Sequence, residues 1–133
     1  MNILSIGSKI TLRKISQEII DKVEKINLLD TSTDYFLNWE FPETNKINYY
    51  SGNIKKIDTL IEAGLNESDI IIIHSDNDID TLFIAQKSKI NSNLIIFVII
   101  EDLSLVEIFE SFGFIILDSH NLKITRLLNK LDN

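Results

Sequence analysis

The 133-residue chain contains no cysteine, which excludes disulfide bonds and thiolate metal sites. One proline and four glycines are too few for a disordered or low-complexity chain. The longest uninterrupted apolar run, Leu94 to Ile100, is far shorter than the roughly 20 residues that a membrane-spanning helix needs. The apolar stretch before Lys9 is too short for a signal peptide and has no basic residue ahead of it. These absences predict a cytoplasmic protein.

Positive charge is also scarce, since the formal net charge is −7 at pH 7. A surface for nucleic acid or an anionic membrane needs clustered lysine and arginine, so we expect no nucleic-acid partner. An apolar content of 44% is sufficient for a packed core, and the length matches one domain. We therefore expect a single domain over residues 1–133.

The first 30 residues follow the pattern that opens a dinucleotide-binding fold. An apolar run from Asn2 to Ile6 ends at Gly7, and a second run from Ile26 to Leu29 ends at Asp30. The segment between them has helical periodicity, with apolar residues at Ile10, Ile15, Ile19 and Val23. A glycine directly after the first strand and an acid about 20 residues later are two anchors of the Rossmann fingerprint.

The turn after Gly7 departs from that fingerprint. Lys9 and Leu12 stand at the positions of its second and third glycines, which let the backbone approach a pyrophosphate and the helix pack closely on the strand. We expect the Cβ of Lys9 to crowd the phosphate position and Leu12 to push the helix outward. The helix N-terminus still offers N–H groups, and Lys9 and Arg13 add cations. An intact dinucleotide site, an adenine-nucleotide site and an empty or remodelled cleft all stay open.

Beyond Asp30, predicted strands and helices alternate to the end of the chain. Apolar runs predict strands at residues 47–50, 70–73, 94–100 and 114–117. Helical periodicity predicts helices through residues 54–61, 82–85 and 105–112, and a last helix that begins at Ser119. Gly64 and Gly113 stand where C-terminal glycine caps are expected. The alternation predicts an α/β fold, a Rossmann-like doubly wound parallel six-stranded sheet with helices on both faces.

Three aromatic residues cluster shortly after Asp30. Thr31 to Asp34 can cap a short helix, in which Tyr35, Phe36 and Trp39 are expected to share one face. We interpret this group as core or edge packing, with a partner-facing patch as the alternative.

Polar residues at the predicted strand ends are the candidate ligand contacts. Asp30 either binds both ribose hydroxyls or caps the helix that starts near Thr33. Ser75 and Asp76 follow the fourth strand at the carboxyl edge of the sheet, where ligands of open α/β folds bind. Their alternative role is simple helix capping.

Metal binding and catalysis are not predicted. The acidic run from Asp76 to Asp80 resembles the start of a calcium loop, but Thr81 and Lys87 replace its required glycine and glutamate. His74 and His120 are the only histidines, and no cysteine is present to join them. No nucleophile motif is recognisable, and hydride transfer would need a substrate domain for which no residues remain. We therefore assign no catalytic and no metal-binding residues.

Several segments, taken in order, resemble one known family. They are Gly7 with Asp30, then Tyr50 to Asn53, Leu60 to Gly64 with Glu67 to Ile70, Ser75 to Asp78, and Glu107 to Gly113. This order is similar to the N-terminal RCK/KTN (TrkA-N type) nucleotide-binding domain of the Trk/Ktr potassium-uptake regulatory proteins. The resemblance extends over nearly the whole chain.

The resemblance implies a non-catalytic regulatory subunit or domain of a potassium-uptake system, without the companion C-terminal RCK domain. The implied cofactor is NAD(H) or an adenine nucleotide (ATP, ADP or AMP), or none. The implied partners are a membrane potassium transporter subunit, at the inner membrane face, and further copies of the chain in a homodimer or higher homo-oligomer. The residues that it assigns to the ligand are Gly7, Ser8, Lys9, Asp30, Thr31, Asn53, Ser75 and Asp76.

Three more positions differ from the family pattern. Ile10 and Ile99 replace common arginines, and Asn53 replaces the aspartate after the third strand. Two alternatives therefore stay open: an interaction module that has lost nucleotide binding, and a small NAD-dependent oxidoreductase with a substrate-facing His, Tyr or Lys. The helix from Leu105 to Phe112 has an apolar face larger than its sheet can cover, which supports self-association.

Overall fold

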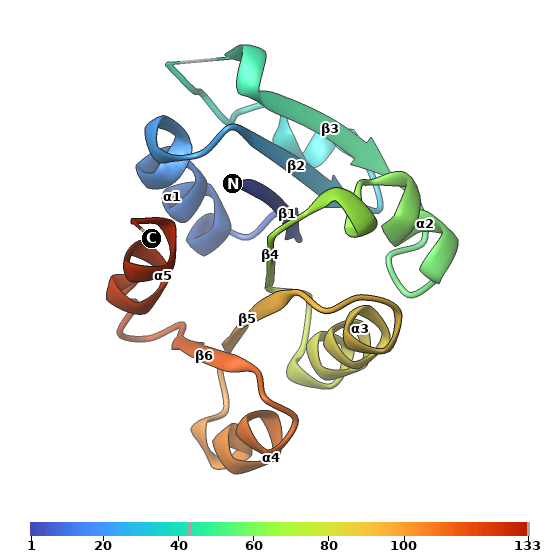
Figure 1. Cartoon of the computed structure of the whole chain (residues 1–133), viewed down its shortest axis with the longest axis vertical. Helices are drawn as coiled ribbons and strands as arrows, with labels where there is room; N and C mark the ends of the chain where they lie inside the picture. Colours follow the sequence, from blue (N-terminus) through green and yellow to red (C-terminus); the bar gives the residue numbers. More distant parts are fainter. Residues whose placement is uncertain (43, 133) are drawn as a thin grey trace.

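The computed structural model describes residues 1–42 and 44–132, which form one parallel six-stranded sheet with helices on both faces (Figure 1). The strand order is β3-β2-β1-β4-β5-β6, and every neighbouring pair is parallel. The predicted fold class is therefore confirmed. The strands are β1 (Asn2–Ile6), β2 (Lys25–Asp30), β3 (Ile47–Ser51), β4 (Ile70–Ile73), β5 (Ile95–Ile100) and β6 (Ile115–Asp118).

Five α-helices connect the strands in the described part of the chain. They are α1 (Ile10–Ile19), α2 (Ile57–Glu62), α3 (Asp78–Asn91), α4 (Val106–Ser111) and α5 (Thr125–Leu131). Short 3₁₀ helices are η1 (Ile20–Lys22), η2 (Thr33–Phe36), η3 (Thr44–Lys46), η4 (Leu65–Glu67) and η5 (Leu103–Leu105). No helix in these two ranges of residues is long and apolar enough to span a membrane.

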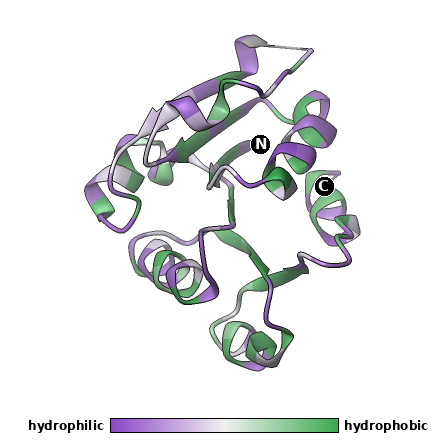
Figure 2. Cartoon of the chain, turned by 180° about the vertical axis from the view of Figure 1, so that it is seen from behind, coloured by the Kyte–Doolittle hydropathy of each residue, from purple (hydrophilic) through white to green (hydrophobic). Residues whose placement is uncertain are grey.

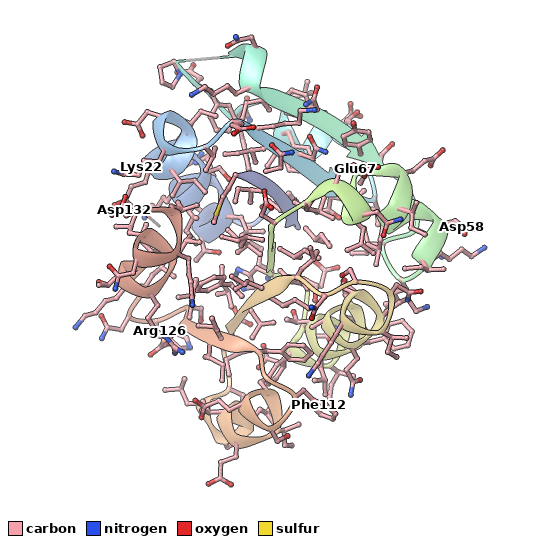
Figure 3. The ribbon with its side chains drawn as sticks, in the orientation of Figure 1. Lys22, Asp58, Glu67, Phe112, Arg126 and Asp132 are labelled. Carbon is pink, nitrogen blue, oxygen red and sulfur yellow. The ribbon has the colours of Figure 1, made fainter. Side chains whose placement is uncertain are left out.

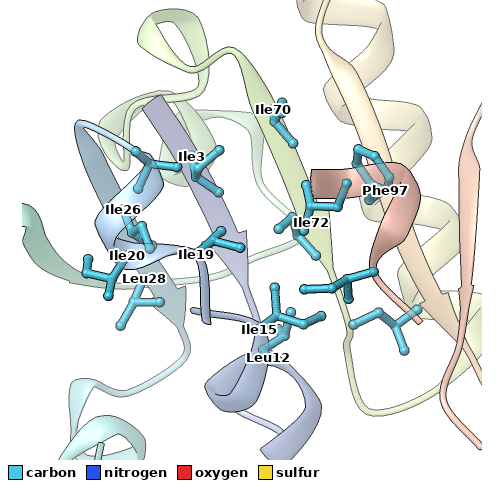
Figure 4. Packing of buried hydrophobic residues seen from close by; sticks show 14 of the residues in the cluster. Ile3, Leu12, Ile15, Ile19, Ile20, Ile26, Leu28, Ile70, Ile72 and Phe97 are labelled. Atoms are coloured by element: carbon cyan, nitrogen blue, oxygen red, sulfur yellow. The ribbon is translucent and has the colours of Figure 1, made fainter. Parts of the chain in front are cut away.

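Alternate residues of each strand feed two separate cores, one on each face of the sheet. Ile70 and Ile72 of β4 belong to the core beneath α1 and α5, whereas Ile71 and Ile73 belong to the core beneath α2, α3 and α4. Because successive side chains in a strand point to opposite faces, a strand covered on both sides must be apolar throughout. Figure 4 shows the first core, with Leu12 and Ile15 of α1 facing the sheet, and Figure 2 shows the apolar strands inside a more polar outer layer.

The ends of several helices are set by local chemistry that the sequence indicates. Gly64 and Gly113 follow α2 and α4 with φ of +102° and +86°, in the left-handed region that favours glycine. Both predicted glycine caps are therefore confirmed. Ser32 caps η2, since its Oγ accepts from the N–H of Asp34 at 3.2 Å. Asp30 is thus not the cap of this helix.

The last helix begins later than the sequence indicates. Residues 119–124 form a connecting loop, and α5 starts at Thr125 rather than at Ser119. The N–H of Ser119 continues the strand ladder by donating to the carbonyl of Ile100, and the N–H of His120 donates to Asp118 Oδ1 at 2.9 Å. These bonds hold the chain in a turn, so Leu122 packs on the core from a loop and not from a helix.

The aromatic group after β2 divides between core and surface. Phe36 and Trp39 are 2% and 8% exposed, with ring centroids 4.9 Å apart in an edge-on arrangement, whereas Tyr35 is 56% exposed. The predicted shared face was wrong for Tyr35, because a 3₁₀ turn has three residues and places positions i and i+3 together. Core packing is therefore the role of Phe36 and Trp39.

This division predicts opposite effects of two neighbouring substitutions. Phe36→Ala should lower the free energy of unfolding by roughly 3–5 kcal/mol, since it empties a buried site. Tyr35→Ala should change it by less than about 0.5 kcal/mol, as expected for an exposed side chain. Urea unfolding followed by circular dichroism measures both values. Equal losses for the two variants would contradict the assignment of faces.

Candidate functional site

The predicted ligand residues gather where the first four strands end. Gly7 follows β1, Asp30 closes β2, Asn53 follows β3 and Ser75 follows β4. All strands are parallel, so these positions share the carboxyl edge of the sheet. The strand order reverses between β1 and β4, which are neighbours in the sheet but distant in the chain. A crevice at such a reversal is where open α/β sheets bind ligands.

Gly7 is the residue at which the sheet and the turn come closest. Its φ is +119°, and a Cβ built on it would lie 2.1 Å from the carbonyl oxygen of His74. No real Cβ approaches a backbone oxygen so closely, so this position requires glycine for both its conformation and its space. The turn is thereby drawn down onto the end of β4.

Ser8 and Asp30 are joined directly across the turn. Ser8 Oγ donates to Asp30 Oδ2 at 2.6 Å, and the N–H of Thr31 donates to Asp30 Oδ1 at 2.6 Å. A carboxylate has about four acceptor positions, and these two bonds use only two of them. The half-exposed Asp30 is therefore held in a fixed orientation while retaining capacity for further donors, such as the two hydroxyls of a ribose.

Lys9 is the N-cap residue of α1, and its backbone conformation does not require glycine. Its φ of −69° and ψ of 156° are ordinary extended values, and its carbonyl accepts from the N–H groups of Leu12 and Arg13. No side chain caps the helix at Lys9. The first N–H groups of α1 therefore remain available, and a helix N-terminus of this kind attracts anions.

Leu12 lies in the core instead of in the cleft. Its side chain is fully buried beneath α1, and its Cδ1 atom would be 3.0 Å from a Cβ at Gly7. The side chain that replaces the third glycine of the fingerprint thus packs underneath the turn. It fills the volume that a glycine would leave between helix and strand.

The remaining predicted residues have local roles. Asn53 is exposed, and its Oδ1 accepts from the N–H of Lys55 at 3.0 Å. Ser75 is buried and bonds to Thr81 Oγ1 at 2.7 Å, in the first turn of α3. Asp76 is exposed and has no hydrogen bond within the described ranges, while Asn77 caps α3 by accepting from the N–H of Asp80. The structure brings Ser8, Asp30 and Thr31 into contact, but not Ser75 or Asp76 with them.

Sequence reasoning missed His74 as part of this edge. It is 4% exposed, and its Nδ1 lies 2.5 Å from Thr11 Oγ1 in the first turn of α1. Its Nε2 has no hydrogen-bond partner among the described residues and lies 4.0 Å from Glu101 Oε1. A histidine directly after the apolar run of β4 was the available signal, since it had to lie at the carboxyl edge.

The surroundings of His74 keep it uncharged at neutral pH. Burial and then the nearby Lys9 charge lower its pKa to about 4, against the opposing influence of Glu101 and Asp78. The contact with Glu101 is therefore not an ion pair at pH 7. Groups of three or more His, Asp or Glu side chains able to hold a metal are absent from residues 1–42 and 44–132.

The lowered pKa of His74 predicts a loss of stability in mild acid. Between about pH 4 and 6.5 the unfolded chain binds a proton that the folded chain does not, so stability falls as pH falls through this window. From pH 7 to pH 5 the contribution of His74 should decrease by about 2 kcal/mol.

Urea unfolding at the two pH values, on the natural chain and on His74→Gln, measures this contribution. The glutamine variant should lose about 2 kcal/mol less than the natural chain over the same interval. Asp and Glu side chains are common to both proteins, so they cancel in the comparison. Identical pH dependence in the two proteins would show that His74 is not responsible.

Comparison with known proteins agrees with this geometry. A family model described as the TrkA-N domain matches residues 6–120. The chain therefore belongs to the TrkA-N domain family, as its sequence predicts. Comparison with curated protein sequences finds no match.

Solved structures share the fold at low sequence identity. The TrkA-N domain of the inner membrane protein ybaL from Escherichia coli superposes with a TM-score of 0.75 at 13% identity, covering 99% of this chain and 96% of that one. The NAD(P)-binding domain of an exopolyphosphatase-related protein from Archaeoglobus fulgidus gives 0.74 at 15%, covering 98% and 96%. The GsuK channel bound to NAD gives 0.72 at 16%, covering 96% of this chain but 22% of the channel.

Proposed function

We propose that this chain is a non-catalytic regulatory domain that binds an adenine nucleotide or NAD(H) at the carboxyl edge of its sheet. The observation that carries the proposal is the carboxylate of Asp30, fixed by Ser8 beside the Gly7 turn and the uncapped start of α1. An acceptor for ribose and an N-terminus for phosphate are the two contacts that an adenosine phosphate needs.

Each residue of the site would make a different contact with the nucleotide. Asp30 accepts from the ribose hydroxyls, and Ser8 and the N–H of Thr31 keep its carboxylate in position. The first N–H groups of α1 hold phosphate, and the ammonium of Lys9 adds positive charge at the same place. NAD(H), when bound, would occupy this site as a sensed ligand rather than as a reacting cofactor.

Two findings support a wider role. The chain belongs to the TrkA-N domain family, which its sequence resembles as part of potassium-uptake regulators, and the GsuK channel bound to NAD has a similar fold. We infer that this chain acts on the cytoplasmic side, as a single TrkA-N-type unit over residues 1–133, in the control of a membrane potassium transporter. Its nucleotide state is the signal that it passes on.

Nucleotide binding should depend on Asp30. In calorimetric titrations with NADH, ATP, ADP and AMP, Asp30→Ala should weaken the tightest of these ligands by tenfold or more, because ribose loses a charged acceptor. Asp58→Ala is the matched control, since Asp58 lies on α2 and points outward (Figure 3). In cells that depend on the cognate transporter for potassium uptake, Asp30→Ala should impair uptake and Asp58→Ala should not.

A second function is favoured by one observation. Lys9 and Leu12 fill both glycine positions of the turn, and Leu12 does so from within the core. An interaction module that kept the scaffold and lost the ligand would give no heat with any of the four nucleotides, and Asp30→Ala would leave potassium uptake unchanged. That pair of results would replace the nucleotide proposal with this one.

Exposed apolar side chains on α3 and α4 support self-association. Phe83 and Ile90 of α3, Ile108 of α4 and Phe112 directly after α4 are all at least 38% exposed, and Phe112 lies beside α4 (Figure 3). Gln86, Lys89, Ile90 and Phe112 line a shallow hollow between the two helices. Ile90 and Phe112 thus form an exposed apolar pair across the hollow, and exposed apolar surface of this kind supports a protein contact.

Self-association through this face predicts a change in size. Light scattering should find a dimer or larger assembly for the natural chain. The double variant Ile108→Ser, Phe112→Ser should raise the dissociation constant of that assembly at least tenfold. Tyr35→Ser is the control. Tyr35 is also an exposed aromatic residue but lies in η2, so its substitution should leave the size unchanged. A monomeric natural chain at high concentration would reject this interface.

A further inference from the structure

A groove beside the nucleotide site runs between α1 and α5. The two helices cover the same face of the sheet and lie side by side (Figure 1). The groove has a volume of about 640 Å³, within the range typical of small-molecule sites. One wall is formed by α1, from Ile10 to Glu18, and the other by the β6–α5 loop and the start of α5, from Ser119 to Leu128.

The charge of the groove is opposite to that of the protein as a whole. The chain has a formal net charge of −7, yet the groove contains Lys14 on one wall and Lys123 on the other, against the single carboxylate of Glu18. Neither lysine has an ion-pair or hydrogen-bond partner in the described part of the chain. Two unpaired ammonium groups facing a hollow favour an anion.

Apolar side chains lie beside these charges. Leu122 and Leu128 line the groove and are partly exposed, whereas Ile15 and Ile124 are buried in the underlying core. Ile10 stands at the rim, 55% exposed to solvent. These side chains favour a ligand with a hydrocarbon portion, because phosphate or a free sugar would make no use of apolar contacts.

One polar group of the lining lacks a partner. The Oγ of Ser119, at the end of β6, is shielded from solvent and makes no hydrogen bond to any described residue. Because this oxygen has almost no accessible surface, we assign it no contact with a ligand in the groove. The groove therefore combines two cations with partly exposed apolar side chains.

We propose that this groove is a second ligand site, which binds an amphipathic monoanion such as a medium-chain carboxylate. The carboxylate lies between Lys14 and Lys123, and the acyl chain lies along Ile10, Leu122 and Leu128. The site shares the start of α1 with the nucleotide proposal, since Ile10 and Thr11 line the groove, but its cations, Lys14 and Lys123, take no part in the contacts of Asp30. A free carboxylate and the acyl end of an anionic lipid share this chemistry, and the experiment separates them.

Titration of the ¹⁵N-labelled chain by NMR tests the proposal with sodium octanoate as the probe. Octanoate should bind at least tenfold more tightly than 1-octanol, which lacks the charge, and than acetate, which lacks the chain. Resonances of residues 10–18 and 119–128 should shift. Octanoate should still bind in the presence of saturating NADH, with at most a small loss of affinity. Vesicles of phosphatidylglycerol should bind no better than vesicles of phosphatidylcholine.

Three variants locate the ligand. The double variant Lys14→Gln, Lys123→Gln should weaken octanoate about tenfold, and Leu128→Asn should weaken it while leaving acetate unchanged. Lys130→Gln, on α5 but outside the groove, is the control and should bind as the natural chain does. All four substituted side chains are at least partly exposed, so the variants should fold.

Several results would overturn the proposal. Octanoate, octanol and acetate could bind alike, or the double lysine variant could bind octanoate unchanged. Binding to phosphatidylglycerol vesicles without binding to free octanoate would indicate a membrane surface instead. If the lysine variants changed the oligomeric state by light scattering, the occupant of the groove would be a second copy of the chain.

Discussion

The close approach of the Gly7 turn to the end of β4 is the contact on which the rest of the site depends. The two segments are more than sixty residues apart in sequence, yet the N–H of His74 donates to the carbonyl of Ile6 at 3.0 Å. This bond continues the β1–β4 ladder past the strand ends, and only a residue without a Cβ fits above the His74 carbonyl. The direction in which α1 leaves the sheet, and hence where its N–H groups point, follows from this one junction.

The altered fingerprint can be understood from the same junction. Its first glycine is indispensable for steric reasons, whereas the position of Lys9 has an extended backbone that any residue adopts. The position of the third glycine is part of the core, because Leu12 packs beneath the turn with Ile15 and Ile19. The three glycines of the pattern therefore serve separable purposes, and this chain keeps the one that the backbone itself requires.

Much of the fold could be predicted because the inner strands are covered on both faces. Ile70 to Ile73 must be apolar at every position, so this run is typical of a strand in a parallel sheet. Gly64 and Gly113 likewise predict the left-handed backbone conformation that ends a helix. The start of α5 was not predictable in the same way, because Ser119 can cap a helix and Leu122 fits its apolar spacing, but this segment is held by bonds to Asp118 and Ile100. Those partners lie in other elements, which local periodicity does not include.

The site was predictable in position but not in its pairings. Parallel strands bring their carboxyl ends to one edge, so Gly7, Asp30 and Ser75 had to lie there, but the sequence does not say which side chains meet. Ser8 reaches Asp30, whereas Ser75 turns into α3. His74 escaped notice because histidine was considered only as a metal ligand. Its burial against Thr11 shows a different use, in which a neutral ring fastens the start of α1 to the end of β4.

The position of α1 connects both proposed ligand sites. Its N-terminus faces the edge where Asp30 lies, and its flank from Ile10 to Glu18 forms a wall of the groove with α5. Leu12, Ile15 and Ile19 anchor the helix across its length in the core, so it behaves as one packed body. Communication between the two sites through a shift of α1 would have to repack that core. Electrostatic influence needs no such repacking, since Lys9 directly precedes α1 and Lys14 lies on it, and an anion near one lowers the positive potential at the other. The arrangement therefore favours weak mutual antagonism between two anionic ligands over a mechanical switch.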